Sequence, residues 1–169
     1  MEGMDPISEF VSHNTDYVAR HGVRQLPTEP QKRLAILTCM DSRLDLFGAL
    51  GLDLGEAHII RNAGGLDTDD AVRSLILSQR KLGTREIMVI QHTRCGLEGL
   101  DEDSLRDELT TDTKQTSTRE FGSFQDVYAN VRLTAQRLNA EPELRHEGLR
   151  GFVFDVDTGE IVEVDLGNS

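Results

Sequence analysis

The sequence predicts an α/β fold in which a mainly parallel central β-sheet is flanked by helices and a C-terminal strand pair extends the sheet. Three short apolar runs have the length and composition of strands that are buried on both faces, at 34–38, 58–60 and 86–90. A helical pattern over 67–82 joins the second run to the third, and such a crossover is the connection that parallel strands require. The segment 151–164 alternates apolar and polar residues around a turn, which is typical of a hairpin.

The N-terminal region is predicted to be a helix followed by a linker. The helix covers residues 5–22. Its apolar residues form a loose stripe that consists of Ile7, Phe10, Val11 and Val18. Segment 25–31 cannot continue the helix because Pro27 and Pro30 lack the backbone N–H that a helix interior needs.

The helix predicted over 67–82 has signals at both of its ends. Asp67 or Thr68 can cap its N-terminus, and acidic residues fill the first turn, where the helix dipole favours them. Gly83 stands where a C-terminal cap belongs.

The rest of the chain completes the sheet and its cover. A short helix is predicted over 101–110, a polar loop over 114–123 and an amphipathic helix over 124–138. The apolar face of that last helix consists of Val127, Val131, Ala135 and Leu138. Residues 152–156 extend the sheet, and the final strand lies at its edge or reaches a partner subunit.

Length and charge restrict the kind of protein. A chain of 169 residues fits one domain, with an N-terminal helix and linker in 1–32 and a metal-binding α/β core in 33–166. The net charge of −12 argues against nucleic acid and against anionic lipid as partners, so we expect a small-molecule substrate. No apolar run approaches the roughly 20 residues of a membrane span, and the first residues do not resemble a secretory signal. We therefore expect a cytoplasmic protein whose two cysteines are free or bind a metal.

Both cysteines follow predicted strands. Cys39 comes directly after the first strand and Cys95 five residues after the third, with His92 between that strand and Cys95. Because open α/β sheets build their sites at the carboxyl ends of parallel strands, these side chains are expected to meet. Thiolate and imidazole are good zinc ligands, and three protein ligands leave a fourth position open, as in catalytic zinc sites. The pattern predicts one Zn²⁺ per chain.

Asp41 and Arg43 can face the same site, because alternate residues of an extended segment share a side. A bidentate pair with Arg43 would keep the Asp41 carboxylate ionised and oriented toward a zinc-bound hydroxide. Without that pair, Asp41 could be the fourth zinc ligand. The residues alone leave both arrangements open.

Three segments together resemble the β-class carbonic anhydrase family. Cys39-Met-Asp-Ser-Arg43 is similar to the family's C-x-D-x-R motif, and His92-Thr-Arg-Cys95-Gly96 is similar to its H-x-x-C-G. Ile60-Arg-Asn-Ala-Gly-Gly65 resembles the intervening R-N-A-G segment. Arg94 departs from the family, because many small members have Asp at this position.

The resemblance implies a zinc lyase that reversibly hydrates carbon dioxide to bicarbonate and a proton. It implies zinc bound by Cys39, His92 and Cys95, with Asp41 and Arg43 as the catalytic pair. It assigns the substrate pocket to four residues, Asn62, Ala63, Gly64 and Gly96. The minimal unit of the family is a dimer, so we expect a homodimer or a dimer of dimers.

Two other functions use the same residues. A zinc hydroxide site can also hydrolyse carbonyl sulfide or carbon disulfide, which are linear and apolar like carbon dioxide. A protein that binds zinc without catalysis is the third hypothesis, although metal binding alone does not require Asp41 and Arg43. His58 has two interpretations, as a proton shuttle or as a histidine of the sheet.

Overall fold

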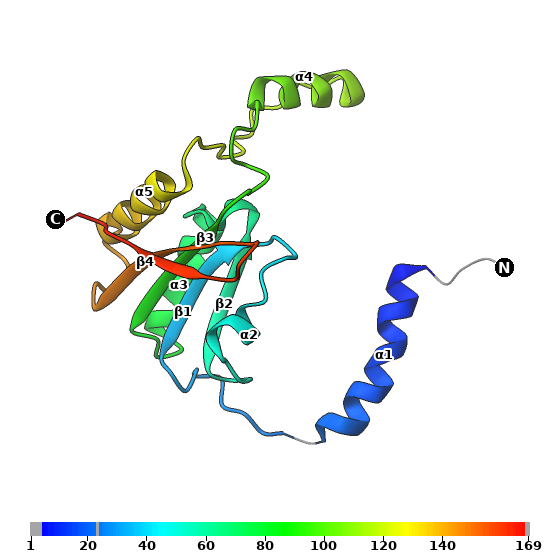
Figure 1. Ribbon diagram of the computed structural model, residues 1–169, viewed down its shortest axis with the longest axis vertical. Coiled ribbons are helices and arrows are strands. Elements are labelled where there is room, and N and C mark those ends of the chain that lie inside the picture. Colours follow the sequence, from blue (N-terminus) through cyan, green and yellow to red (C-terminus); the bar gives the residue numbers. More distant parts are fainter. Residues whose placement is uncertain (1–4, 23, 168–169) are drawn as a thin grey trace.

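The central sheet has five strands in the order β2-β1-β3-β4-β5 (Figure 1). The computed structural model describes residues 5–22 and 24–167. Strands β1 to β4 are parallel to one another, and β5 is antiparallel to β4 at one edge of the sheet. The strands are β1 (Leu34–Cys39), β2 (Ala57–Asn62), β3 (Glu86–His92), β4 (Gly148–Phe154) and β5 (Ile161–Val164). The predicted parallel sheet with a C-terminal strand pair is confirmed.

The strand register places the predicted site residues at one edge of the sheet. Cys39 on β1 pairs with Asn62 on β2, and both residues end their strands. His92 ends β3 next to Phe154, the last residue of β4. The carboxyl ends of four parallel strands therefore lie side by side.

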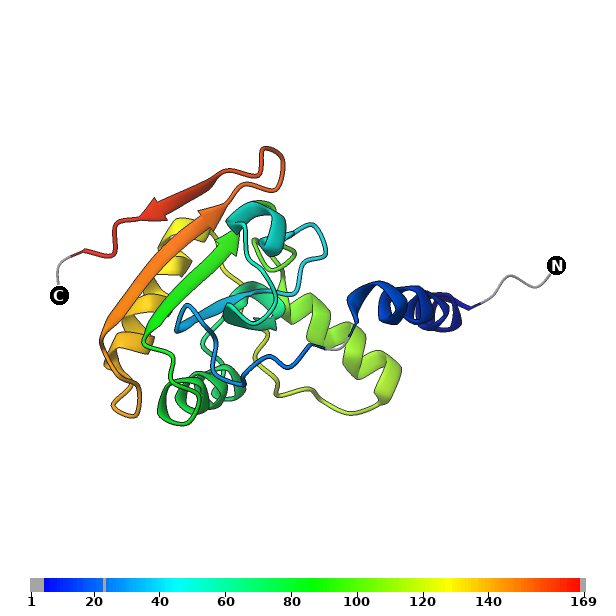
Figure 2. The ribbon, with the colours of Figure 1, turned by 90° about the horizontal axis from the view of Figure 1, so that it is seen from below.

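Alternate residues of β1 serve hydrophobic cores on opposite faces of the sheet. Leu37 of β1 packs with Leu75 and Leu138 on one face of the sheet, where helices α3 (Asp69–Arg80) and α5 (Val127–Ala140) cover the strands (Figure 2). Ile36 packs on the other face, where the five-residue helix α2 (Leu46–Leu50) supplies Leu46. Cys39 and Cys95 belong to this second core. The candidate site therefore lies on the face of the sheet that helices cover less.

Side-chain caps determine where the longer helices begin. Thr68, one of the two predicted caps, accepts a hydrogen bond from the Ala71 amide at the start of α3. Asp101 caps α4 (Glu102–Thr113), which extends three residues past the predicted end. Asp126 caps α5, so the prediction that this helix begins at Phe124 is wrong. The backbone of Phe124 instead bonds to that of Leu97 and Gly99 in the preceding loop.

The C-terminal end of α3 also differs from the prediction. The helix ends at Arg80 with Lys81 as its C-cap, and Gly83 follows two residues later with φ +75°. Gly83 therefore supplies the left-handed turn toward β3 and does not cap the helix itself.

Helix α1 (Pro6–His21) begins at the cap Asp5 and points away from the sheet (Figures 1 and 2). None of its described residues is buried. Its predicted apolar stripe is exposed, and Ile7, 75% accessible, and Phe10, 70% accessible, are the two most exposed large apolar side chains among the described residues. Among the described residues, no helix is long and apolar enough to cross a membrane.

Candidate metal centre

The structure brings the three predicted metal ligands together. Cys39 ends β1, His92 ends β3, and Cys95 lies in the turn that follows β3. One ligand atom from each residue lies within 4.8 Å of the other two. All three residues are buried, and His92 is 0% exposed. Two sulfurs and one imidazole nitrogen therefore converge in a site that solvent reaches only in part.

His92 is oriented for metal binding by its own backbone. Its Nδ1 lies 2.8 Å from the carbonyl oxygen of Thr93, an acceptor, so Nδ1 carries the ring proton and donates. The other ring nitrogen, Nε2, therefore has a free lone pair. Nε2 is the one buried side-chain N or O atom among the described residues without a hydrogen-bond partner. Burying such an atom is costly unless something binds it, and a metal ion between the two sulfurs would do so.

The surroundings of Cys39 favour its thiolate form. The neighbouring Cys95 thiol, and then the nearby His92 ring, lower the pKa of Cys39 to about 4, although burial acts in the opposite direction, and the same contact between the two sulfurs raises the pKa of Cys95. The backbone amide of Gly64 also donates to the Cys39 sulfur, at 3.3 Å. Because the thiolate is the metal-binding form of cysteine, this sulfur is ready to bind a cation. Two cysteines and one histidine, with Nε2 free, fit zinc.

The amide of Gly64 reaches the Cys39 sulfur because a single 3₁₀ turn, η1 (Ala63–Gly65), follows β2. Gly65 has φ +64°, and a Cβ added there would meet the backbone carbonyl carbon of Thr38 at 2.9 Å. The glycine is therefore required both for its conformation and for its close approach to β1.

Replacing Gly65 by alanine is expected to lower the free energy of unfolding by about 2–4 kcal/mol, because the left-handed conformation and the overpacking both add cost. Gly51→Ala is the matched control, since Gly51 has φ +63° and an added Cβ there meets nothing within 4 Å. The control is expected to cost about 1–2 kcal/mol. Urea unfolding of both variants gives the difference, and equal losses would show that the contact with Thr38 is unimportant.

Asp41 and Arg43 form a bidentate pair beside the ligands. Arg43 Nε donates to Asp41 Oδ1 at 2.9 Å, and Arg43 Nη2 donates to Oδ2 at 2.7 Å. This pairing with Arg43 holds the pKa of Asp41 well below its usual range. Asp41 Oδ2 also lies 3.7 Å from His92 Nε2, the metal-facing nitrogen. Of the two arrangements that the residues left open, the structure adopts the one in which Asp41 pairs with Arg43.

Arg61 holds the segment that carries these groups, a role that the sequence did not indicate. From β2 its Nε donates to the carbonyl oxygen of Cys39 at 2.8 Å, and its Nη2 donates to that of Asp41 at 2.6 Å. One guanidinium thereby fixes the backbone at a metal ligand and at a member of the ion pair. The acceptors are backbone atoms some 20 residues away, which no local pattern in the sequence reveals.

The four predicted pocket residues lie close to the ligands but have different surroundings. The Asn62 side chain donates to the Leu66 carbonyl at 2.7 Å and accepts from the Leu66 amide at 2.8 Å, so it closes the η1 turn. Ala63 and Gly64 form that turn. Gly96 directly follows Cys95, and the space that a Cβ would occupy there is open within 4 Å. A direct contact of these residues with a substrate stays a prediction.

His58 has the surroundings of a structural histidine. Its Nδ1 lies 2.8 Å from the hydroxyl oxygen of Ser78, and its Nε2 lies 3.3 Å from the carbonyl oxygen of Thr28. These contacts connect β2 to α3 and to the linker. They favour the interpretation of His58 as a histidine of the sheet.

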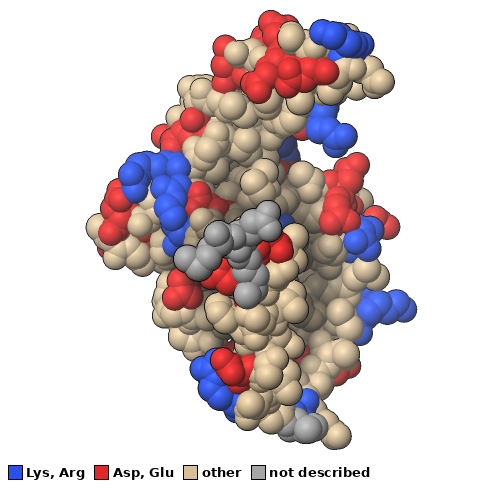
Figure 3. All heavy atoms as spheres, turned by 90° about the vertical axis from the view of Figure 1, so that its right-hand side faces the viewer, with Lys and Arg blue, Asp and Glu red and all other residues tan. Residues whose placement is uncertain are grey.

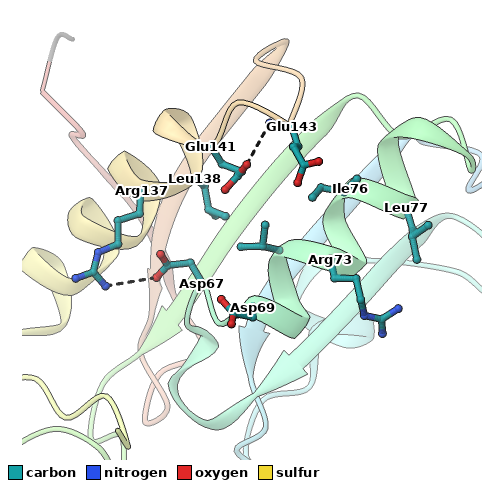
Figure 4. A pocket seen from close by; sticks show the side chains of 10 residues that line it. Asp67, Asp69, Arg73, Ile76, Leu77, Arg137, Leu138, Glu141 and Glu143 are labelled. Carbon is teal, nitrogen blue, oxygen red and sulfur yellow. Dashed lines mark hydrogen bonds and ion pairs between the residues drawn. The ribbon is translucent and has the colours of Figure 1, made fainter.

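A groove of about 800 Å³ between α3 and α5 is separate from this centre (Figure 4). Leu138 and Ile76 line its apolar part, and Arg137 reaches across toward Asp67, with 3.8 Å between Nη1 and Oδ1. It contains none of the predicted site residues. It also lies on the sheet face covered by α3 and α5, whereas both cysteines belong to the core of the opposite face.

Comparison with known proteins agrees with this geometry. The sequence model of the carbonic anhydrase family matches residues 34–161, a range that includes every ligand and the Asp41–Arg43 pair. The chain is 42% identical over 163 residues to β-carbonic anhydrase 1 of Mycobacterium tuberculosis, covering 95% of this chain and 99% of that protein. The chain belongs to the β-carbonic anhydrase family.

Other members extend the comparison. The crystal structure of the carbonic anhydrase from Streptococcus mutans superposes with a TM-score of 0.92 at 41% identity, over 96% of this chain and 99% of that one. A carbon disulfide hydrolase from Acidithiobacillus thiooxidans is 35% identical over 82% of this chain and 80% of its own length. β-Carbonic anhydrases are zinc enzymes, and the grouped Cys39, His92 and Cys95 agree with that cofactor.

Proposed function

We propose that the chain catalyses the reversible hydration of carbon dioxide to bicarbonate and a proton, with one zinc ion held by Cys39, His92 and Cys95. The observation that carries the proposal is the placement of the Asp41–Arg43 pair beside an incomplete ligand set. A structural zinc site is closed by four protein ligands, whereas these three leave a position for a reactant. Zinc, when bound there, supplies Lewis acidity that lowers the pKa of a coordinated water to about 7.

Asp41 orients the attacking group by accepting a hydrogen bond from it. Asp41 is ionised because Arg43 pairs with it, so its carboxylate oxygens accept hydrogen bonds only. Oδ2, 3.7 Å from His92 Nε2, is the acceptor nearest to the ligands. A nucleophile that donates to Oδ2 has its lone pair turned toward the substrate. Asn62, Ala63, Gly64 and Gly96 are proposed to border the space for the small linear substrate.

Stopped-flow hydration of carbon dioxide, on protein of measured zinc content and from about pH 7 to pH 9, tests the function. We expect activity at one zinc per chain, rising with pH. The same preparation is then assayed with carbon disulfide and carbonyl sulfide, because relatives at 34–35% identity are named carbon disulfide hydrolases. Faster turnover of a sulfur compound would replace the proposed substrate. Zinc binding without any turnover would support the non-catalytic hypothesis.

We further propose that the chain works in the cytoplasm as one domain in a homodimer or a dimer of dimers. The apolar stripe of α1 is exposed, and in Figure 3 this helix presents mostly uncharged side chains in the lower centre. A solitary helix of 16 residues is marginal in water, so a second copy that covers the stripe would stabilise it. Replacement of Phe10 and Val11 by serine is expected to shift the mass measured by light scattering toward the monomer. An unchanged mass would place the interface elsewhere.

A further inference from the structure

We propose that Arg94 and Asp157 form a positioning pair that holds Arg43, and through it the Asp41 carboxylate, in the orientation used for catalysis. Arg94 follows the ligand His92 by two residues, and Asp157 lies in the turn between β4 and β5. Neither residue belongs to the metal ligands or to the catalytic pair. The inference rests on the proposed function, because it assigns a role within the same site.

Arg43 has a second acceptor besides Asp41. Its Nη2 donates to Asp41 Oδ2 at 2.7 Å and to the backbone carbonyl oxygen of Arg94 at 3.0 Å. If Asp41 were its only side-chain partner, the Arg43 guanidinium could rotate together with the Asp41 carboxylate. A backbone acceptor on another loop fixes the guanidinium plane relative to the metal ligands. The Arg94 carbonyl therefore helps to fix the Arg43 guanidinium, together with its bonds to Asp41.

The backbone of Arg94 is in a conformation that a non-glycine residue rarely adopts. Its φ is +52°, in the left-handed region, where a Cβ is disfavoured. Such a conformation persists only when its surroundings compensate for it. One compensating contact in the structure is that of the Arg94 side chain itself, whose guanidinium forms an ion pair and hydrogen bond with the Asp157 carboxylate.

Asp157 is a firm anchor because its hairpin is bound to the same turn. The amide of Thr93 donates to the Phe154 carbonyl at 3.0 Å, and the Thr93 hydroxyl accepts from the Val156 amide at 3.1 Å. Within the hairpin, the Asp155 carboxylate accepts from the Asp157 amide at 2.8 Å. The β4–β5 turn and the turn that carries Cys95 are therefore bound to each other, and Arg94–Asp157 is a further link between them.

This link predicts an effect on turnover without an effect on metal binding. Loss of the pair frees the Arg94 backbone, and the Arg43 guanidinium then loses its fixed acceptor. Asp41 keeps its charge but samples other orientations, including movement onto the metal. Among the described residues, the side chains of Arg94 and Asp157 form no hydrogen bond with the ligand atoms of Cys39, His92 and Cys95.

The test uses the zinc-loaded full chain with Arg94→Ala, Asp157→Ala and the double variant. Each single change is expected to lower kcat about two- to fivefold, the range that an exposed ion pair can supply, with KM and zinc content unchanged. The double variant is expected to be no worse than either single variant, because both remove one interaction. The charge-reversed pair Arg94→Asp with Asp157→Arg is expected to recover part of the lost kcat.

Arg150 and Glu163 provide the matched control. They form an ion pair across β4 and β5 with a similar exposure, at 2.5 Å, but contact neither Arg43 nor Asp41. Arg150→Ala and Glu163→Ala are expected to leave kcat unchanged. Equal losses of kcat in these controls would show that Arg94–Asp157 only stabilises the β4–β5 hairpin, and they would overturn the inference. Unchanged kcat in Asp157→Ala, or losses that multiply in the double variant, would also overturn it.

Cobalt substitution separates this inference from the proposed function. The visible spectrum of the Co²⁺-loaded protein responds to a change in coordination and does not require turnover. We expect Arg94→Ala and Asp157→Ala to shift the spectrum in the same way, and Arg150→Ala not to shift it. An inactive wild-type chain would contradict the proposed function, whereas identical spectra of all variants would contradict the positioning role alone.

Discussion

Replacing Cys95 by alanine is expected to remove both zinc and carbon dioxide hydration. The change leaves Cys39 and His92 as the only ligands of the group. Changes to groups that merely support a ligand already weaken metal binding about 10- to 100-fold, so loss of a ligand should cost more than about 100-fold. Zinc content after gel filtration, measured together with the hydration rate, gives both results.

Cys95→Ser is the matched variant for this experiment. Serine keeps the size and polarity of cysteine but is a poor zinc ligand at neutral pH, because its hydroxyl stays protonated. Both variants should therefore lose zinc equally, while circular dichroism reports whether the sheet still forms. A Cys95→Ala protein that retains one zinc per chain would show that the ligand set is wrong.

Asp41→Asn is expected to retain zinc and to lose activity by about 100-fold, the cost that misplacing a reacting group can have. Asparagine loses the charge that pairs with Arg43, and its amide offers one acceptor oxygen in place of two. Asp45→Asn is the control, because Asp45 caps α2 through a bond from Gly48, and asparagine caps equally well. Near-normal turnover of Asp41→Asn would contradict the role of the pair.

The pKa of Asp41 also limits the interpretation of a pH profile. Pairing lowers the folded-state pKa below the unfolded value. The stability that the pair contributes is therefore fully present above the unfolded pKa, near 4, and is lost only as the pH falls through the lower, folded value. Asp41 stays ionised throughout an assay from about pH 7 to pH 9. A rise in activity across that range therefore reports the titration of another group.

The strands were predictable because burial on both faces requires continuous apolar sequence. The run around Leu37 and the run around Val89 became β1 and β3, and their carboxyl ends carry the ligands that the motifs predicted. Helix α2 was not predicted, because five residues are too few to show a helical period. The start of α5 was predicted too early because Phe124, which belongs to a loop bridge, fits the apolar spacing of the helix.

Sequence patterns could not predict the contacts that support the site. Arg61 bonds to backbone carbonyls on a neighbouring strand end, and any residue at those positions offers the same acceptor. Arg94 was noticed as a departure from the family, yet its partner Asp157 lies 63 residues away. Only the strand order, which puts β4 beside β3, brings the two together. Motifs thus predict the reacting groups, while the topology determines what holds them.

The short β5 strand at one edge of the sheet has a consequence for aggregation. Edge strands expose unpaired backbone groups that can pair with another molecule and start aggregation. The sheet has two edges, β2 and β5, and β5 has only four residues and carries Glu163, so a foreign strand at β5 would gain few hydrogen bonds and meet a carboxylate. With a net charge of −12, copies of the chain also repel one another as they approach. The β5 edge is therefore protected against edge-to-edge assembly.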